Sequence, residues 1–251
     1  MLGVVAAAAA PAFAQPAAPV AAVVLGEPPT YLQRPLSEVP NAAAIRTRIW
    51  SPGLDDGWVP QGVAVGGGYL YVGDARTLYR IDTDAALAAG KCEPPACAAI
   101  ALPRAWRADA LAYRDGMLWF ATHAARGAGT GRMVQVSQRD VLARADGGDG
   151  APDERAARRA LPIADQTQGA AVAADGSLWL TQSDGKCGRL QKVDPETGMV
   201  MASYAMPAGI EDVEFAPGGR LWTVSEAGSR RWSSWRTFYP LVFSVDPGML
   251  R

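Results

Sequence analysis

The chain has 251 residues, and its 24 Lys and Arg nearly balance its 25 Asp and Glu. A chain with so little excess charge lacks the basic surface that holds phosphate backbones, which argues against nucleic acid as a partner. Hydrophobic residues make up 49% and charged residues 20%, as is typical of a folded globular protein. His123 is the single histidine, which excludes zinc sites built on several histidines.

The amino terminus, residues 1–14 (MLGVVAAAAAPAFA), is a run of small apolar residues that ends in the A-x-A pattern of a signal-peptide cleavage site. The positive charges that usually precede such a run are absent. A transmembrane helix is the alternative, but the run is short and interrupted by Pro11 and Pro16. We expect residues 1–14 to be a signal peptide and residues 15–43 to be an Ala/Pro-rich arm. The mature chain would then have no transmembrane span and would be secreted or periplasmic.

Export makes the cysteines informative. Cys92 and Cys97 flank a Pro-Pro pair in the segment KCEPPAC, and in an oxidising compartment we expect them to form a disulfide. Cys187 is then left either as a free buried thiol or as a partner for one of the other two.

Four segments, which begin at residues 60, 108, 167 and 210, share one pattern. Each has an apolar strand, a tight turn with glycine, a second strand with Leu and an aromatic residue, a variable loop and a third strand. The matched aromatic residues suit the filling of the space between stacked sheets; they are Tyr71, Trp119, Trp179 and Trp222. The segments therefore indicate a structural repeat.

The repeat predicts an all-β fold, a β-propeller with four four-stranded blades. A fourth strand is expected after each of the first three repeats, at residues 98–102, 160–163 and 199–205. The fourth repeat lacks this strand, and the alternating segment Ala44–Trp50 is expected to supply it and close the ring. Residues 44–251 would then form one domain, most simply a monomer, with five blades as the alternative.

The D-G-x-L-W hairpins and the hydrophobic-Asp-x-x-x-G strand end at 193–198 resemble the NHL, gluconolactonase-like and strictosidine-synthase-like propellers. The resemblance covers about residues 58–248 and implies a propeller fold. In gluconolactonase-like propellers it also implies a divalent metal, held by Glu, Asp and Asn, that polarises a lactone. The single asparagine here, Asn41, lies outside the repeats. A lyase of the strictosidine-synthase type would instead need an acid such as Glu211 or Glu226.

The inner strands begin with a polar residue at one matched position, and in a propeller these positions surround the mouth of the central channel. The four residues are Gln61, Asp109, Gln168 and Glu211. We expect a mouth filled by water or by a ligand, and simple hydration is the alternative to binding.

The fourth repeat differs, because Asp212 and Glu214 stand where the other repeats have Gly or Ala. Buried carboxylates need a cation, hydrogen bonds or a raised pKa. One hypothesis is Ca²⁺, with oxygen ligands from Asp109, Glu211 and Asp212. The other is an internal ion pair with an arginine of the following loop, namely Arg230, Arg231 or Arg236.

That loop, residues 225–240, carries several aromatic side chains and is expected to lie over the channel mouth. The candidate ligand-binding residues are Gln61, Gln168, Glu226, Arg230, Trp232 and Trp235. The candidate catalytic residues are Glu211, Asp109 and His123, the last as a general base at the rim or as a packing residue.

Together these features favour an exported propeller that binds a small ligand or a protein partner on its loop-rich face. The alternative is a Ca²⁺-dependent, lactonase-like hydrolase with the ion held by carboxylates at the channel mouth.

Overall fold

The computed structural model describes residues 23–66, 69–73, 77–89, 96–101, 111–114, 117–122, 132–137 and 159–251. This part of the chain is mostly β-structure. Its strands are β1 (Val23–Leu25), β2 (Ile45–Trp50), β3 (Gly62–Gly66), β4 (Tyr69–Gly73), β5 (Thr77–Ile81), β6 (Cys97–Ala101), β7 (Leu111–Arg114), β8 (Met117–Thr122), β9 (Arg132–Ser137), β10 (Arg159–Pro162), β11 (Thr167–Val172), β12 (Leu178–Ser183), β13 (Gly188–Val193), β14 (Val200–Met206), β15 (Ile210–Phe215), β16 (Leu221–Ser225) and β17 (Leu241–Val245).

The strands form four sheets. Sheet 1 has the order β3-β4-β5-β6, sheet 2 β7-β8-β9-β10, sheet 3 β11-β12-β13-β14, and sheet 4 β15-β16-β17-β2-β1. All neighbours pair antiparallel except β1 and β2, which are parallel. The repeated sequence pattern therefore corresponds to repeated antiparallel sheets, as expected.

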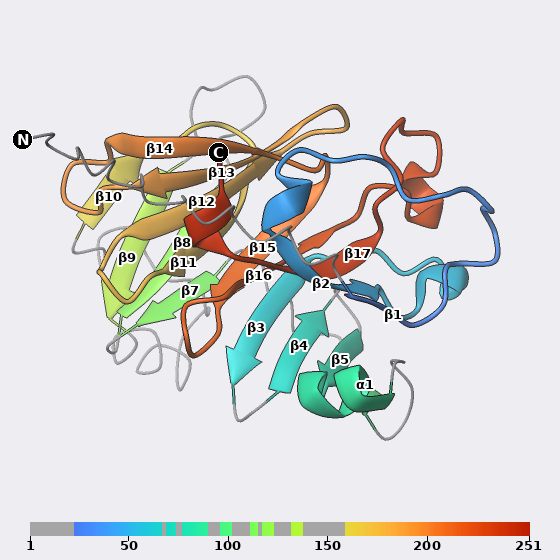
Figure 1. Ribbon diagram of the computed structural model, residues 1–251. Coiled ribbons are helices and arrows are strands. Elements are labelled where there is room, and N and C mark those ends of the chain that lie inside the picture. The colour runs from blue at the N-terminus through green and yellow to red at the C-terminus, as the bar shows by residue number, and fades with distance from the viewer. Residues whose placement is uncertain are drawn as a thin grey trace, which may run out of the picture.

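The first strands of the sheets lie next to one another. β15 of sheet 4 contacts β3 of sheet 1 on one side and β11 of sheet 3 on the other, and β11 also contacts β7 of sheet 2. This is a propeller-like arrangement, with sheet 4 between sheets 1 and 3 (Figure 1). Within the described residues, β3 and β7 do not pack extensively against each other, so the inner strands do not complete a closed ring.

Hydrophobic clusters separate the sheets. The cluster between sheets 1 and 4 includes Leu70 and Trp222, and the cluster between sheets 4 and 3 includes Trp179 and Phe243. The Trp179 indole stacks on Tyr204 and meets the ring of Phe215 edge-on, with centroids 6.0 and 5.8 Å away. The matched aromatic residues at 179 and 222 thus fill the space between neighbouring sheets, as the repeat predicts.

The amino-terminal strand completes sheet 4. The alternating segment predicted to pair with the last strand forms β2, which pairs antiparallel with β17 from Trp50 opposite Leu241 to Ile45 opposite Val245. Its buried positions alternate with half-buried ones, as the sequence pattern predicts. The arm adds β1, which was not predicted, and sheet 4 therefore has five strands rather than four.

Other features differ from expectation or lie outside the described residues. Between β5 and β6 the chain forms a helix, α1 (Thr83–Ala89), which the repeat pattern does not contain. Cys187 is free and exposed, not buried. Residues 1–14 and Cys92 lie outside the described part, so the signal peptide and the disulfide to Cys97 remain predictions. No helix of the described segments is long and apolar enough to cross a membrane.

Asp212 joins the inner strands of three sheets. It lies on β15, is 5% exposed, and its Oδ2 accepts a hydrogen bond from the backbone N–H of Val63 on β3 at 3.1 Å. Its other oxygen accepts from Val213 at 2.9 Å, and the backbone N–H of Ala170 on β11 also donates to the carboxyl. Burial nevertheless raises the pKa of Asp212 well above its ordinary value. The carboxyl is therefore a bridge between sheets.

Gly169 shows how closely β11 approaches this residue. A Cβ added to Gly169 would lie 2.4 Å from the Cα of Asp212 and 2.6 Å from its Oδ1. The small residue in the third repeat and the carboxylate in the fourth therefore complement each other. This explains why one repeat has Gly where another has Asp.

We predict that Asp212→Ala lowers the free energy of unfolding by about 2–4 kcal/mol, because buried backbone N–H groups lose their acceptor. Asp212→Asn keeps one carbonyl oxygen and should cost clearly less. Urea denaturation of the wild type and both variants measures the difference. Equal stability of the three proteins would contradict the bridging role.

Candidate functional site

Two β-bulges occur at the beginning of inner strands. The register of β15 against β16 shifts between Ile210 and Val213, and that of β11 against β12 shifts between Thr167 and Gly169. A bulge changes the direction of side chains and is frequent near binding sites. In β15 it contains two successive carboxylates, and Asp212 is directed to the neighbouring strands while Glu211 meets another acid.

Glu211 and Glu226 form a hydrogen-bonded carboxyl pair. Glu211 is 5% and Glu226 is 8% exposed. Burial, together with the nearby Glu226, raises the pKa of Glu211 to about 9. Burial also raises the pKa of Glu226, whereas the side chains of Trp232 and Glu211 lower it. Glu211 is therefore the protonated donor and Glu226 the acceptor at neutral pH.

Gln61 connects the pair to the surface. Its side chain is exposed, and its Nε2 donates to Oε2 of Glu226 at 3.1 Å and to the carbonyl of Pro60 at 3.1 Å. Two of the polar residues at the matched inner-strand position, Gln61 and Glu211, are thus both linked to Glu226. Gln168 lies at the β11 bulge and is half-buried, without a hydrogen bond to this pair.

The arginines of the loop do not neutralise these acids. None of Arg230, Arg231 and Arg236 forms an ion pair with Glu211, Asp212 or Glu214 within the described part of the chain, so the expected ion pair is wrong. The guanidinium of Arg231 instead lies 4.5 Å from the centre of the Trp232 ring, where its charge also lowers the pKa of Glu226. Arg230 lies 5.1 Å from the centre of the Tyr31 ring.

Among the described residues, no group of three or more His, Cys, Asp or Glu side chains could hold an ion. The predicted Ca²⁺ site includes Asp109, so it stays a prediction. Asp109 and His123 lie outside the described residues, so their roles remain predictions. Glu214 is farther along β15, opposite Trp222, and accepts a hydrogen bond from the N–H of Phe215 at 2.8 Å. Burial raises its pKa to about 7.

The loop between β16 and β17, residues 226–240, forms a cover that we call the lid. Trp232 and Trp235 are half-buried and stack with ring centroids 4.8 Å apart and an interplanar angle of 22°. The Trp232 indole nitrogen is buried beside Glu226 without a hydrogen bond of good geometry. Trp235 packs on Gly185 and Gly209, where an added Cβ would lie 3.0 and 3.1 Å from its ring.

The amino-terminal arm fastens the lid from outside. The Tyr31 hydroxyl donates to the carbonyl of Gly228 at 2.6 Å, and Nη2 of Arg34 donates to the carbonyl of Trp235 at 3.1 Å. Ser37 exchanges two hydrogen bonds with the backbone of Phe238, at 3.0 and 2.6 Å. Figure 1 shows the arm curving around the same end of the molecule as this loop. The arm is therefore part of the site's outer wall.

Sequence reasoning missed these arm residues. They lie in residues 15–43, which have no periodic pattern and were interpreted only as an arm. Gly228 is a feature of the sequence that could have indicated a constrained loop at this point. Its φ of +95° and its closeness to the Phe238 ring both require glycine. The pairing of Glu226 with Glu211 was also not predicted, although each residue was named as a candidate.

No protein-family model matches the sequence, and no curated protein is significantly similar to it. Among solved structures, a glutaminyl cyclase from Myxococcus xanthus is 14% identical with a TM-score of 0.37, over 74% of this chain and 72% of that one. Regucalcin from Agrobacterium tumefaciens, a calcium-binding protein, is 12% identical with a TM-score of 0.34, over 80% and 75%.

An aldose sugar dehydrogenase from Streptomyces coelicolor, solved with bound PQQ, is 16% identical with a TM-score of 0.34, over 88% of this chain and 83% of that one. At these identities and TM-scores, the similarities do not define the activity of this chain.

We predict that stability falls as the pH rises from about 4.5 to about 9. Glu211 keeps its proton over this range only when the chain is folded, because its pKa is raised from 4.5 to about 9. Unfolding in this pH range therefore releases the Glu211 proton. As a result, the free energy of unfolding falls by about 1.4 kcal/mol for each unit of increasing pH. Urea denaturation at pH 5, 7 and 9 measures this slope. It should be shallower in Glu211→Gln, and an unchanged slope would contradict the proton assignment.

We predict that Tyr31→Phe loosens the lid, because the carbonyl of Gly228 loses its hydroxyl donor. A hydrogen bond worth about 1 kcal/mol corresponds to about fivefold faster opening. Hydrogen–deuterium exchange of residues 226–239 measures it. The control is Tyr204→Phe, which removes a hydroxyl from β14 and should leave lid exchange unchanged. Equal lid exchange in both variants would show that the arm does not hold the lid.

Proposed function

We propose that this protein binds a small polar ligand at the Glu211–Glu226 pair, beneath the lid. The observation that carries the proposal is a buried carboxyl pair that has no cation within 4.0 Å among the described residues. Burying carboxyl groups without a cation lowers the stability of the folded protein. Such groups occur most often at functional sites, where they bind a ligand. Gln61, which is exposed and bonded to Glu226, gives the pair a polar connection to solvent.

The free hydrogen-bonding groups favour a neutral ligand with hydroxyl groups. The O–H of Glu211 is used on Glu226, and Nε2 of Gln61 is used on Glu226 and Pro60. The remaining carboxyl oxygens of the pair and the amide oxygen of Gln61 are acceptors for a ligand that donates. The stacked indoles of Trp232 and Trp235 supply the flat apolar surface on which a sugar-like ring packs. A site with both features suits a small polyhydroxylated or lactone-like molecule.

The wider setting is part of the proposal. Residues 1–14 support export by a signal peptide, with the mature protein periplasmic or secreted. The four sheets support a four-bladed propeller of the NHL, gluconolactonase-like and strictosidine-synthase-like kind, with the fourth blade completed by β2. In that arrangement the carboxyl pair would lie at the mouth of the central channel. A small molecule is favoured over a protein partner because the acids are almost completely buried.

The alternative function is a Ca²⁺-dependent, lactonase-like hydrolase. It is favoured by the same unneutralised acids, because Ca²⁺ prefers carboxylate and amide oxygens. Glu211, Glu226 and the Gln61 amide oxygen fit such an ion chemically, whereas Asp212 does not, since its oxygens accept backbone hydrogen bonds between sheets. The alternative therefore requires Asp109 as a further ligand.

Thermal unfolding separates the two functions. The protein is heated with a panel of monosaccharides and aldonolactones, and separately with CaCl₂ and then EDTA. We expect a midpoint increase of several degrees with at least one neutral compound and no increase with CaCl₂. The affinity for that compound should fall about tenfold or more in the double variant Trp232→Ala/Trp235→Ala and in Glu226→Gln.

The control for folding is the midpoint of each variant without ligand, which should change less than the affinity. A CaCl₂ shift that disappears in Glu211→Gln and Asp109→Ala, together with lactone hydrolysis, would establish the alternative. No response to any compound or to CaCl₂ would contradict both.

A further inference from the structure

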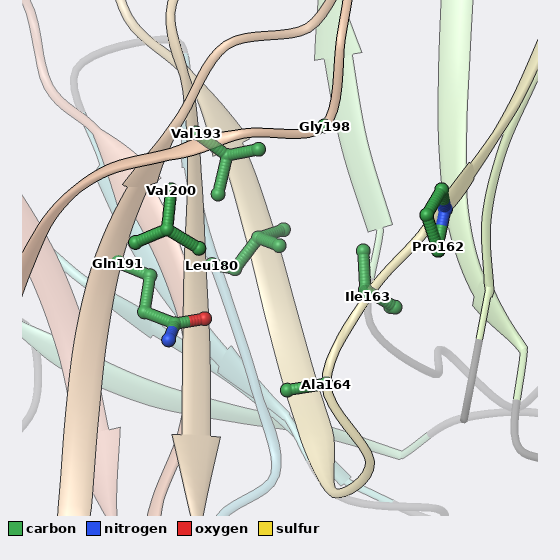
Figure 2. A pocket seen from close by; sticks show the side chains of 8 residues that line it. All are labelled: Pro162, Ile163, Ala164, Leu180, Gln191, Val193, Gly198 and Val200. Carbon is green, nitrogen blue, oxygen red and sulfur yellow. The ribbon is translucent and has the colours of Figure 1, made fainter. Parts of the chain in front are cut away.

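A cavity lies away from the carboxyl pair, on the face of sheet 3 that is turned toward β10. Its volume is about 250 Å³. Figure 2 shows its walls, which come from β12–β14 on one side and from the segment after β10 on the other. The lining residues are Pro162, Ile163, Ala164, Leu180, Gln191, Val193, Gly198 and Val200.

The position of the cavity follows from the packing of sheet 3. The face that contains Trp179 packs on sheet 4, whereas Leu178, Leu180 and Val193 on the opposite face form a smaller cluster with Leu161 and Ile163. The lining side chains Leu180 and Val193 are almost completely buried at the base. Val200 pairs with Val193 at the edge of the sheet and is 48% exposed, so the cavity has an apolar rim open to solvent.

The lining contains one polar side chain and no charged one. That side chain is Gln191, which is half-buried and forms no side-chain hydrogen bond with the described residues. In Figure 2 its amide oxygen is directed toward the wall formed by Ile163 and Ala164. A primary amide offers both a donor and an acceptor, so an amide ligand can pair with it through two hydrogen bonds. Ligand sites commonly combine an apolar wall with one or two such groups.

We propose that this cavity binds a small neutral molecule with a short aliphatic chain and an amide group, held by Gln191. One water molecule occupies about 30 Å³ in the liquid, so the cavity has room for a ligand of about eight non-hydrogen atoms. The aliphatic chain would replace water on Leu180, Val193 and Val200, which is favourable for apolar surface. A carboxylate of equal size should bind more weakly, because no cation lines the cavity to offset its desolvation.

The test uses hexanamide, which has eight non-hydrogen atoms, and hexanoate at neutral pH as its charged counterpart. Methyl NMR of the full chain follows the signals of Leu180, Val193 and Val200. We expect saturable shifts with hexanamide and a dissociation constant of the order of millimolar, as for other ligands of this size. Hexanoate should bind at least about tenfold more weakly. Absence of saturable shifts, or equal binding of hexanoate, would overturn the proposal.

Two variants locate the interaction. Gln191→Leu replaces the amide by an apolar side chain of similar size and should lower the affinity for hexanamide about fivefold or more. Benzene serves as an apolar probe without an amide group, and its affinity should change by no more than about twofold. Ala164→Leu fills the cavity and should remove the binding of both compounds. Trp232→Ala changes the lid and should leave hexanamide binding unchanged. The proposals for this cavity and for the carboxyl pair can therefore fail independently of each other. Unchanged hexanamide affinity in both Gln191→Leu and Ala164→Leu would overturn it.

Discussion

The structure depends on one buried carboxyl group, that of Asp212, which joins the inner strand of sheet 4 to those of sheets 1 and 3. Its oxygens accept backbone hydrogen bonds from Val63 and Val213, and Ala170 donates as well. Two further polar contacts reach β15 from the neighbouring sheets: the Thr181 hydroxyl donates to the carbonyl of Glu211, and the N–H of Asp212 donates to the carbonyl of Gln61 at 3.3 Å. Because Asp212 holds the neighbouring strands in place, the adjacent Glu211 is fixed at a bulge with its carboxyl beside Glu226. Sheet assembly and the proposed binding chemistry are therefore assigned to two successive residues, Asp212 and Glu211.

The repeated pattern of strands, turns and aromatic residues predicts the β-sheets well, because strand alternation and the positions of Gly in turns are local properties of the sequence. The pairing of Ala44–Trp50 with the last strand was also predictable, since a regular alternation without a local partner must pair elsewhere. The helix α1 and the strand β1 were not predictable in this way. Their segments depart from the repeat, and β1 depends on contacts with a strand that is itself distant in sequence from the rest of sheet 4.

The site was predicted in part. The carboxylates of the fourth repeat stood out because they replace Gly or Ala, but the sequence does not show which of them faces a neighbouring backbone and which faces another acid. The bulge in β15 determines the directions of these side chains. A shift of one residue in register would exchange the positions of Asp212, which joins the sheets, and Glu211, which donates to Glu226. The arginines were expected to neutralise these acids. Arg230 and Arg231 lie instead on aromatic rings, where a guanidinium loses less hydration than it would in a buried ion pair.

The pairing of β2 with β17 also governs how the chain can fold. These strands lie far apart in the sequence, so sheet 4 cannot be completed until residues 241–245 have left the ribosome. Sheets 1 and 3 both pack on sheet 4, and before it forms each has an apolar face without a partner. Until then these apolar faces lack their partner sheet, and exposed apolar surface of this kind favours aggregation and chaperone binding in general. The same long-range pairing that completes sheet 4 thus postpones its folding until residues 241–245 have been synthesised.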